Sequence, residues 1–139
     1  ESLHVRMARH CENAQAVAEY LSRHPRIAWV RYSGLPGDPY YETARKYLPR
    51  GSCGVVSFGV RGGRAAAEAF MKRLELGTIA THVADARTCC LHPASTTHRQ
   101  MNDAELAAAG VGADLVRLSV GLENREDLIA DLDQALQSV

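Results

Sequence analysis

The sequence predicts an α/β fold of the two-layer (α+β) kind, in which helices cover one small β-sheet. Two observations carry this prediction. Segments with apolar residues at helical spacing alternate along the chain with short runs of β-forming residues between turn signals. A length of 139 residues, 46% of them hydrophobic, also suits one hydrophobic core and is too short for two ordinary domains.

The first half of the chain predicts two helices and two strands. Residues 1–23 form an amphipathic helix, which we expect to continue upstream because no capping residue clearly opens it. Residues 27–32 and 53–60 are rich in β-formers and flanked by turn residues, which predicts two strands. A short helix over 40–48 lies between them. The apolar stripe of the first helix comprises Leu3, Met7, Ala14, Val17, Ala18 and Leu21.

The second half continues the alternation. Residues 65–74 predict an Ala-rich helix, and 78–83 and 87–91 predict two extended segments. The loop over 92–100 follows, with Pro93 and several hydroxyl and imidazole side chains. Loops of this composition carry binding groups more often than cores do.

Two capped helices flank the last predicted strand. Asn102 and Glu105 have the spacing of a capping box, which predicts a short helix after the loop. Residues 115–121 are apolar and β-branched, and predict the strand. Asn124 with Asp127 then caps the final helix. The apolar stripe of that helix comprises Leu128, Ile129, Leu132, Ala135 and Leu136.

Composition argues against several classes of partner. Lys plus Arg equals Asp plus Glu at 16 each, so we expect no nucleic-acid partner. No apolar run approaches the roughly 20 residues that span a bilayer, and no signal peptide is recognisable, so we expect a cytoplasmic protein without membrane contact. The four cysteines lack Cys-x-x-Cys spacing, which predicts reduced thiols. His92 and His98 lack further ligands at zinc spacing, so we expect no metal site.

A charged residue interrupts the last predicted strand. Arg117 stands in the apolar run LVRLSV, and period-two alternation puts it on the same face as Leu115 and Ser119. A guanidinium held on a strand suits bidentate capture of a carboxylate. A structural ion pair with an internal Asp or Glu explains the charge equally well from spacing alone. The residues by themselves leave both interpretations open.

Two motifs resemble the signature of the C-terminal domain of the Cys/Met-metabolism (trans-sulfuration) enzymes, which depend on pyridoxal 5′-phosphate (PLP). They are HPASTTH at 92–98 and RLSVGLEN at 117–124. The chain is most similar to the O-acetylhomoserine sulfhydrylase branch. The resemblance implies that residues 1–139 are the C-terminal substrate-binding domain of a fold-type I PLP-dependent transferase, with the PLP-binding domain upstream. Further matching stretches are RHCENA at 9–14, GLPGDPYY at 34–41, KYLPRG at 46–51 and GVVSFGV at 54–60.

The resemblance also implies a substrate site. Arg117 is then the residue that binds the substrate α-carboxylate. The family's second carboxylate contact, a Ser or Asn in an S-L-G or N-x-G stretch, falls on His82, followed by Val83 and Ala84, so the sequence departs from the pattern there. An imidazole donates a hydrogen bond, but it is larger than Ser and titrates near neutral pH. Thr81 lies where the family tunes side-chain specificity.

The cofactor chemistry is expected to come from outside these residues. In the family, a lysine holds PLP as a Schiff base and the cofactor acts as an electron sink. The only lysines here, Lys46 and Lys72, match no cofactor motif of the family, so no catalytic residue is assigned within 1–139. We expect this chain alone to be inactive, and the full-length enzyme to bind PLP and form a homotetramer.

One reaction is favoured by the resemblance. An O-acetylhomoserine sulfhydrylase converts O-acetyl-L-homoserine and sulfide into homocysteine and acetate. Methionine or cystathionine γ-lyases and cystathionine or O-succinylhomoserine γ-synthases are alternatives within the family, because they share the carboxylate-binding arginine. A free-standing, non-catalytic amino-acid-binding module is an alternative of another class, because the chain has no recognisable cofactor lysine.

Overall fold

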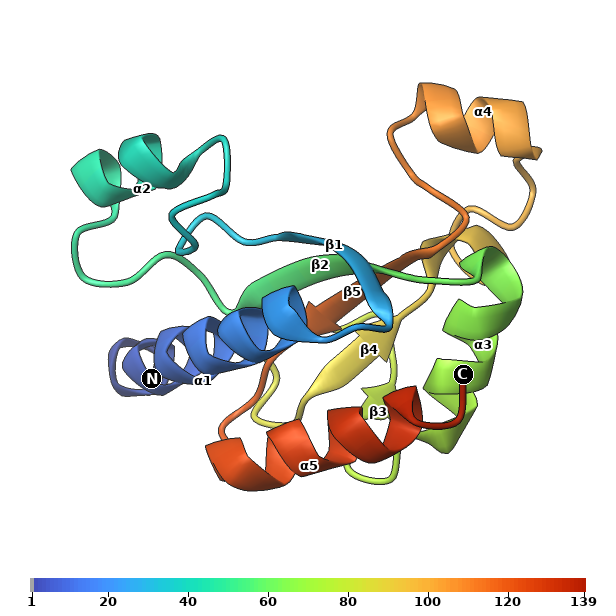
Figure 1. The fold of residues 1–139 in the computed structure, drawn as a ribbon. Coiled ribbons are helices and arrows are strands. Elements are labelled where there is room, and N and C mark those ends of the chain that lie inside the picture. The colour runs from blue at the N-terminus through green and yellow to red at the C-terminus, as the bar shows by residue number, and fades with distance from the viewer. Residues whose placement is uncertain (1) are drawn as a thin grey trace.

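Five strands form one mixed sheet in the computed structural model, which describes residues 2–139 (Figure 1). The strand order is β1-β2-β5-β4-β3. Neighbouring strands are antiparallel except β3 and β4, which run parallel. β5 is therefore the central strand of the sheet. The strands are β1 (Ile27–Arg31), β2 (Val55–Val60), β3 (Thr78–Ile79), β4 (Cys89–Leu91) and β5 (Leu115–Ser119).

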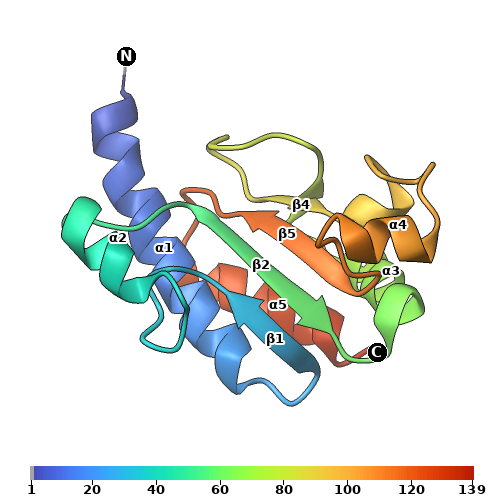
Figure 2. The same ribbon diagram turned by 90° about the horizontal axis from the view of Figure 1, so that it is seen from above.

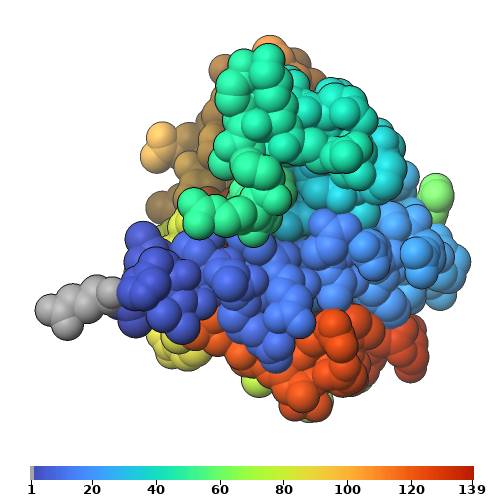
Figure 3. Space-filling view, turned by 90° about the vertical axis from the view of Figure 1, so that its left-hand side faces the viewer, coloured from blue at the N-terminus to red at the C-terminus, as the bar shows by residue number. Residues whose placement is uncertain are grey.

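The helices leave one face of the sheet open. α1, α3 and α5 pack on one face, and Figure 3 shows α1 lying between the α2 segment and α5. On the opposite face, β2 and β5 lie uncovered between α2 and α4 (Figure 2). The predicted small sheet with covering helices is thus confirmed. The helices are α1 (Leu3–Arg23), α2 (Tyr41–Tyr47), α3 (Gly63–Arg73), α4 (Asp103–Ala108) and α5 (Arg125–Leu136), with a 3₁₀ turn η1 (Pro93–Ser95) after β4.

The hydrophobic core lies between the sheet and the three packed helices. Phe58 of β2 and Val116 and Leu118 of β5 point into it and are fully buried. The ring of Phe58 meets that of Phe70 of α3 edge-on, with 5.8 Å between centroids. Such pairs add about 0.5–1.5 kcal/mol to the burial of the rings themselves. Because this face of the central strand is committed to the core, the alternate residues of β5 face the open side.

Two sequence predictions need correction. Leu3 of the expected apolar stripe is 52% exposed, because the first turns of α1 extend past the sheet (Figure 2). Glu1 lies outside the described residues. The extended segment predicted over 78–83 forms a strand only at Thr78–Ile79, and the last ladder-type hydrogen bond runs from the Ala80 N–H to the Cys90 carbonyl. Beyond it, the chain leaves the sheet and contacts β5 side chains instead.

The helix caps agree closely with the sequence. The Asn102 side chain accepts from the Glu105 N–H (3.0 Å), and the Glu105 carboxylate accepts from the Asn102 N–H (2.8 Å), which confirms the capping box of α4. Asn124 caps α5 as predicted, but its side chain accepts from the Glu126 N–H rather than from Asp127. Both helices that flank β5 therefore begin at defined residues. No helix within residues 2–139 is both long and apolar enough to cross a membrane.

A hydrogen-bonded pair of titratable residues, Tyr20 and Asp133, joins α1 to α5. Tyr20 donates to Asp133 Oδ1 (2.5 Å), and His24 Nε2 lies 3.6 Å from the same oxygen. The Tyr20 hydrogen bond is the main cause that lowers the pKa of Asp133 below its ordinary value of 3.8. A carboxyl pKa lowered on folding stabilises the fold above the unfolded pKa, and this contribution is lost as the pH falls through the folded value. The pair therefore contributes at neutral pH and not in strong acid.

Replacing Tyr20 by Phe is expected to lower the free energy of unfolding by about 0.5–1 kcal/mol at pH 7, near the lower end for a hydrogen bond because Asp133 is 42% exposed. The difference from the parent protein should shrink as the pH drops below about 4. Urea titrations at several pH values measure both effects. Tyr47→Phe is the matched control, because Tyr47 is 68% exposed. A Tyr20→Phe deficit that is constant down to strong acid would contradict the assignment to Asp133.

Candidate functional site

Arg117 lies at the centre of the open sheet face. Within the sheet, Arg117 of β5 pairs with Ser57 of β2 on one side and with Leu91 of β4 on the other. Its strand neighbours Val116 and Leu118 are buried on the helix-covered face, so the half-buried Arg117 points to the other side. The predicted alternation along this strand is confirmed. A rigid central strand thus presents the guanidinium on the face that no helix covers.

The guanidinium of Arg117 has donors to spare. Its Nη2 donates to the carbonyl oxygens of Thr81 (2.9 Å) and His82 (3.4 Å). Its Nε is buried and finds no acceptor within residues 2–139. A buried donor without a partner costs about 1–3 kcal/mol. Nη1 also makes no hydrogen bond within residues 2–139 and, unlike Nε, is not enclosed, so it is the donor that an acceptor from outside the described residues can reach.

The alternative of a structural ion pair is wrong for the described part of the chain. The ion pairs found between residues 2 and 139 involve other arginines, and none includes Arg117. A half-buried cation without an acidic partner is uncommon in a core or in a sheet, because its desolvation is uncompensated. An anionic ligand would supply the missing charge.

The other two predicted site residues lie in the loop between β3 and β4. The structure brings Thr81 and His82 to Arg117 through their main-chain carbonyls, while their side chains are exposed. The sequence predicts a role for their side chains and carries no signal for the carbonyl contacts. The carbonyls orient the guanidinium, and the exposed side chains of Thr81 and His82 lie on the same loop.

One carboxylate in this loop is neutralised locally. The Arg87 N–H donates to Asp85 Oδ1 (2.9 Å), and Nε of Arg87 lies 3.5 Å from the same oxygen. These contacts with Arg87 lower the pKa of Asp85. Asp85 therefore remains ionised at neutral pH and is paired with Arg87, so its charge does not compete for Arg117.

The far end of the loop is fixed by a carboxylate that sequence reasoning missed. Glu123 accepts from the Thr88 N–H (2.6 Å) and from the Thr88 hydroxyl (2.9 Å). The Thr88 hydroxyl in turn accepts from the Gly121 N–H (2.8 Å). A Cβ at Gly121 would lie 2.5 Å from both the Ala86 oxygen and the Thr88 nitrogen. The glycine therefore permits the close approach of the two segments.

α1 holds the same segment from the other side. Asn13 donates to the carbonyls of Gly121 (3.0 Å) and Glu123 (2.9 Å), and His10 Nδ1 donates to the Val120 carbonyl (2.6 Å). Both side chains are almost completely buried. His10 and Asn13 are polar residues on the otherwise apolar face of α1, and buried polar groups need hydrogen-bond partners. This pattern is the sequence signal that indicates the contact. Residues 9–14 and 117–124, matched separately by their sequence motifs, thus form one hydrogen-bonded unit.

The histidine and cysteine candidates have structural surroundings. Both ring nitrogens of buried His92 are engaged, with Ser95 Oγ and the Ala113 carbonyl, each at 2.8 Å. Burial raises the pKa of the Cys90 thiol, which therefore stays protonated. All four cysteines are free thiols. Residues 2–139 hold no cluster of three or more His, Cys, Asp or Glu side chains arranged for a metal ion.

The residues of this chain do not fit a PLP site. Lys46 and Lys72 are both exposed, on α2 and α3, and Nζ of Lys46 lies 5.0 Å from the ring centre of Tyr47. A Schiff-base lysine requires a desolvated or otherwise depressed ammonium to act as a nucleophile. Neither lysine has such surroundings. Residues 2–139 therefore offer no lysine in surroundings suited to the Schiff base.

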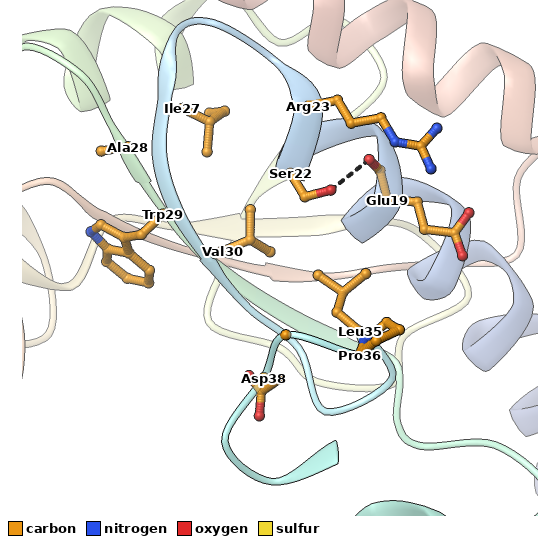
Figure 4. A pocket seen from close by; sticks show the side chains of 11 residues that line it. Glu19, Ser22, Arg23, Ile27, Ala28, Trp29, Val30, Leu35, Pro36 and Asp38 are labelled. Atoms are coloured by element: carbon orange, nitrogen blue, oxygen red, sulfur yellow. Dashed lines mark hydrogen bonds between the residues drawn. The ribbon is translucent and has the colours of Figure 1, made fainter. Parts of the chain in front are cut away.

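A surface hollow elsewhere on the molecule does not include the predicted site residues. It measures about 510 Å³ and lies between the end of α1, the outer edge of β1 and the following turn (Figure 4). Val30, Leu35 and Pro36 give it an apolar wall, while Glu19 and Arg23 stand at its rim. Glu19 is already engaged by the Gln15 amide (2.7 Å). We place the candidate site at Arg117 and not in this hollow, because a charged donor with defined hydrogen-bonding geometry is a stronger indication of a specific anion site than a surface hollow is.

The fold and site together define an α/β domain whose central strand presents an arginine that has no acidic partner in the described residues. The family model for the Cys/Met metabolism PLP-dependent enzymes matches residues 1–137. The chain belongs to this family of PLP-dependent enzymes. The resemblance inferred from the motifs is thereby confirmed.

Relatives of the chain include proteins named as sulfhydrylases and as lyases. The chain is 47% identical to O-acetyl-L-homoserine sulfhydrylase of Leptospira meyeri over 100% of its own length and 32% of that protein. It is 44% identical to L-methionine gamma-lyase of Porphyromonas gingivalis, covering 100% of the chain and 35% of the relative. A solved Campylobacter jejuni structure, described as an O-acetylhomoserine (thiol)-lyase carrying a pyridoxyl-lysine phosphate, superposes with a TM-score of 0.92 at 38% identity, covering 99% of this chain and 32% of that one. The chain therefore spans about a third of the length of these relatives.

With stoichiometric PLP, the 139-residue chain is expected to form no borohydride-stable adduct at a single lysine, because Lys46 and Lys72 are exposed ammonium groups. Mass spectrometry of the reduced protein measures the adduct and its position. Glycine ethyl ester as a competing amine is the control for adventitious labelling. Stoichiometric, competitor-resistant labelling of one lysine would contradict the assignment of the cofactor to other residues.

Proposed function

We propose that this chain is the substrate-binding domain of a PLP-dependent O-acetylhomoserine sulfhydrylase-like enzyme, and that Arg117 binds the α-carboxylate of the amino-acid substrate. The observation that carries the proposal is the Arg117 guanidinium, which lies half-buried on the open face of the central strand without an acidic partner in the described residues. The names of the relatives support the reaction: O-acetyl-L-homoserine and sulfide would give homocysteine and acetate.

The contribution of this domain is binding and orientation. A guanidinium offers a planar fork that matches the two oxygens of a carboxylate. The Thr81 and His82 carbonyls hold Nη2 and thereby fix the plane of the group. A carboxylate bound to a fixed fork has few orientations left, so the Cα atom of the substrate is placed reproducibly. Bond making and breaking at the cofactor belongs to the rest of the enzyme.

The loop side chains take the more specific roles in this proposal. His82 donates a second hydrogen bond to the carboxylate from the position where the family pattern has Ser or Asn. Thr81 faces the substrate side chain and influences which γ-substituent is accepted. Both side chains are exposed in this domain and belong to the loop that contacts Arg117, which supports these roles.

Steady-state assays of the full-length enzyme test the reaction. We expect homocysteine formation from O-acetyl-L-homoserine and sulfide to exceed the release of 2-oxobutyrate from L-methionine or cystathionine. The second candidate is a methionine γ-lyase, since L-methionine gamma-lyases of three bacteria share 42–44% identity with the chain. Faster elimination from methionine than sulfhydrylation would favour that candidate. The open reading frame upstream distinguishes both from a free-standing binding module, which would have its own start site.

A further inference from the structure

Ala84 has an unusual backbone conformation beside the proposed carboxylate site. Its φ is +58°, and it is the single non-glycine residue with positive φ in the part of the chain that the structure describes. A residue with a Cβ atom adopts the left-handed region at a cost in free energy, so the surrounding contacts must hold it there.

The contact that holds Ala84 comes from the central strand. The Ala84 N–H donates to Oγ of Ser119 (3.0 Å), whose side chain is 1% exposed. Ser119 follows Arg117 by two residues and lies on the same face of β5. One strand therefore contacts the loop twice, through the guanidinium at Thr81 and His82 and through the hydroxyl at Ala84.

The two contacts depend on each other geometrically. A left-handed residue reverses the direction of the chain, so, with the loop anchored at Thr88, the conformation of Ala84 sets where the preceding carbonyls lie relative to β5. Those carbonyls, at Thr81 and His82, are the acceptors of the Arg117 guanidinium in the described chain. Beyond Ala84, the Thr88–Glu123 hydrogen bonds fix the loop independently. Ser119 is thus the buried side chain that fixes the part of the loop next to Arg117.

We propose that Ser119 is a positioning residue for carboxylate recognition: its hydroxyl holds Ala84 in the left-handed conformation and so keeps the Thr81 and His82 carbonyls on the Arg117 guanidinium. Ser119 itself does not contact the ligand. This inference rests on the proposed role of Arg117 and adds a residue that acts through it.

The test is a titration of the full-length enzyme with two matched ligands, measured by calorimetry. L-Norleucine carries the α-carboxylate and has no leaving group, and n-pentylamine is the same molecule without the carboxylate. Ser119→Ala is expected to weaken norleucine binding about tenfold and to leave pentylamine binding within about twofold. Ser138→Ala is the control, because it also removes a hydroxyl that bonds one backbone group, Ala135 O at 2.7 Å, far from the site.

A second substitution separates positioning from general destabilisation. Adding Ala84→Gly to Ser119→Ala makes the left-handed conformation accessible without the hydroxyl, and is expected to recover most of the lost norleucine affinity. A role of Ser119 that does not run through Ala84 would give no such rescue. If Ser119→Ala does not fold, Ser119→Cys retains a weak acceptor and should show a loss of about fivefold for norleucine alone.

The outcomes distinguish this inference from the function on which it rests. If Arg117→Ala abolishes the preference for norleucine over pentylamine and the Ser119 variants bind norleucine as tightly as the parent, the positioning role is wrong. Equal losses for both ligands, or no rescue by Ala84→Gly, also overturn it. If Arg117→Ala leaves the preference unchanged, the carboxylate role of Arg117 is itself wrong.

Discussion

Replacing Arg117 by alanine in the full-length enzyme is expected to lower kcat/KM by about two to three orders of magnitude. Removal of a bidentate, charge-assisted contact costs roughly 2–4 kcal/mol of transition-state stabilisation, because binding and orientation of the substrate are lost together. Steady-state kinetics with O-acetyl-L-homoserine and saturating sulfide measure the effect. The half-buried position of Arg117 on the central strand, without an acidic partner in the described residues, is the basis for placing the loss at the upper end of single-contact effects.

Two further variants test whether the loss of kcat/KM comes from the guanidinium of Arg117. Arg117→Lys should restore little, since an ammonium cannot reproduce the planar fork. Arg64→Ala is the matched control, because Arg64 pairs with Asp103 (2.6 Å) and donates to the Ala94 carbonyl, away from the loop that contacts Arg117. The Arg117 variants should retain the visible absorbance of the cofactor, because in the proposed enzyme the cofactor is held by other residues. An Arg117→Ala enzyme within a few fold of the parent would refute the carboxylate role.

Most of the fold could be predicted because local patterns and tertiary packing agree. The alternating burial along β5 follows from period two, and the capping box at Asn102 and Glu105 forms as its residues indicate. The short β3 could not be predicted in the same way. Thr81 and His82 have strand-like neighbours in sequence, but their carbonyls bind the Arg117 side chain, which is 35–36 residues away in the chain.

The site could be predicted only in part, because only some of its features have a local signal in the sequence. Arg117 stands out in sequence because a charge interrupts an apolar strand, and this signal is local. The support around it is not local: Glu123 meets Thr88, and Asn13 meets Gly121, over separations of 35 and 108 residues. Only a tertiary structure brings such groups together. Gly121 carried no sequence signal of its own beyond its place in the RLSVGLEN stretch.

Gly121→Ala is expected to lower the free energy of unfolding by about 2–4 kcal/mol, which is among the largest effects for a single methyl group. The added Cβ would lie 2.3 Å from Glu123 Oε2, 2.5 Å from the Ala86 oxygen and 2.5 Å from the Thr88 nitrogen. The carboxylate can rotate away, but the last two atoms belong to the backbone. Relief of the clash therefore requires the two segments to separate.

Separation would break the hydrogen bonds that join these segments, namely Leu122 N–H to the Ala86 carbonyl (2.8 Å) and Gly121 N–H to the Thr88 hydroxyl (2.8 Å). Each buried group left without a partner adds about 1–3 kcal/mol, which is why the estimate exceeds that for simple overpacking. Gly37→Ala is the matched control, because a Cβ there meets nothing within 4 Å, and it should change stability by less than about 0.5 kcal/mol. Urea denaturation of both variants with an unchanged m-value measures the difference. Equal stabilities for the Gly121 and Gly37 variants would show that the loop yields to the methyl group without loss, and that the Thr88–Glu123 contacts do not hold it rigidly against β5.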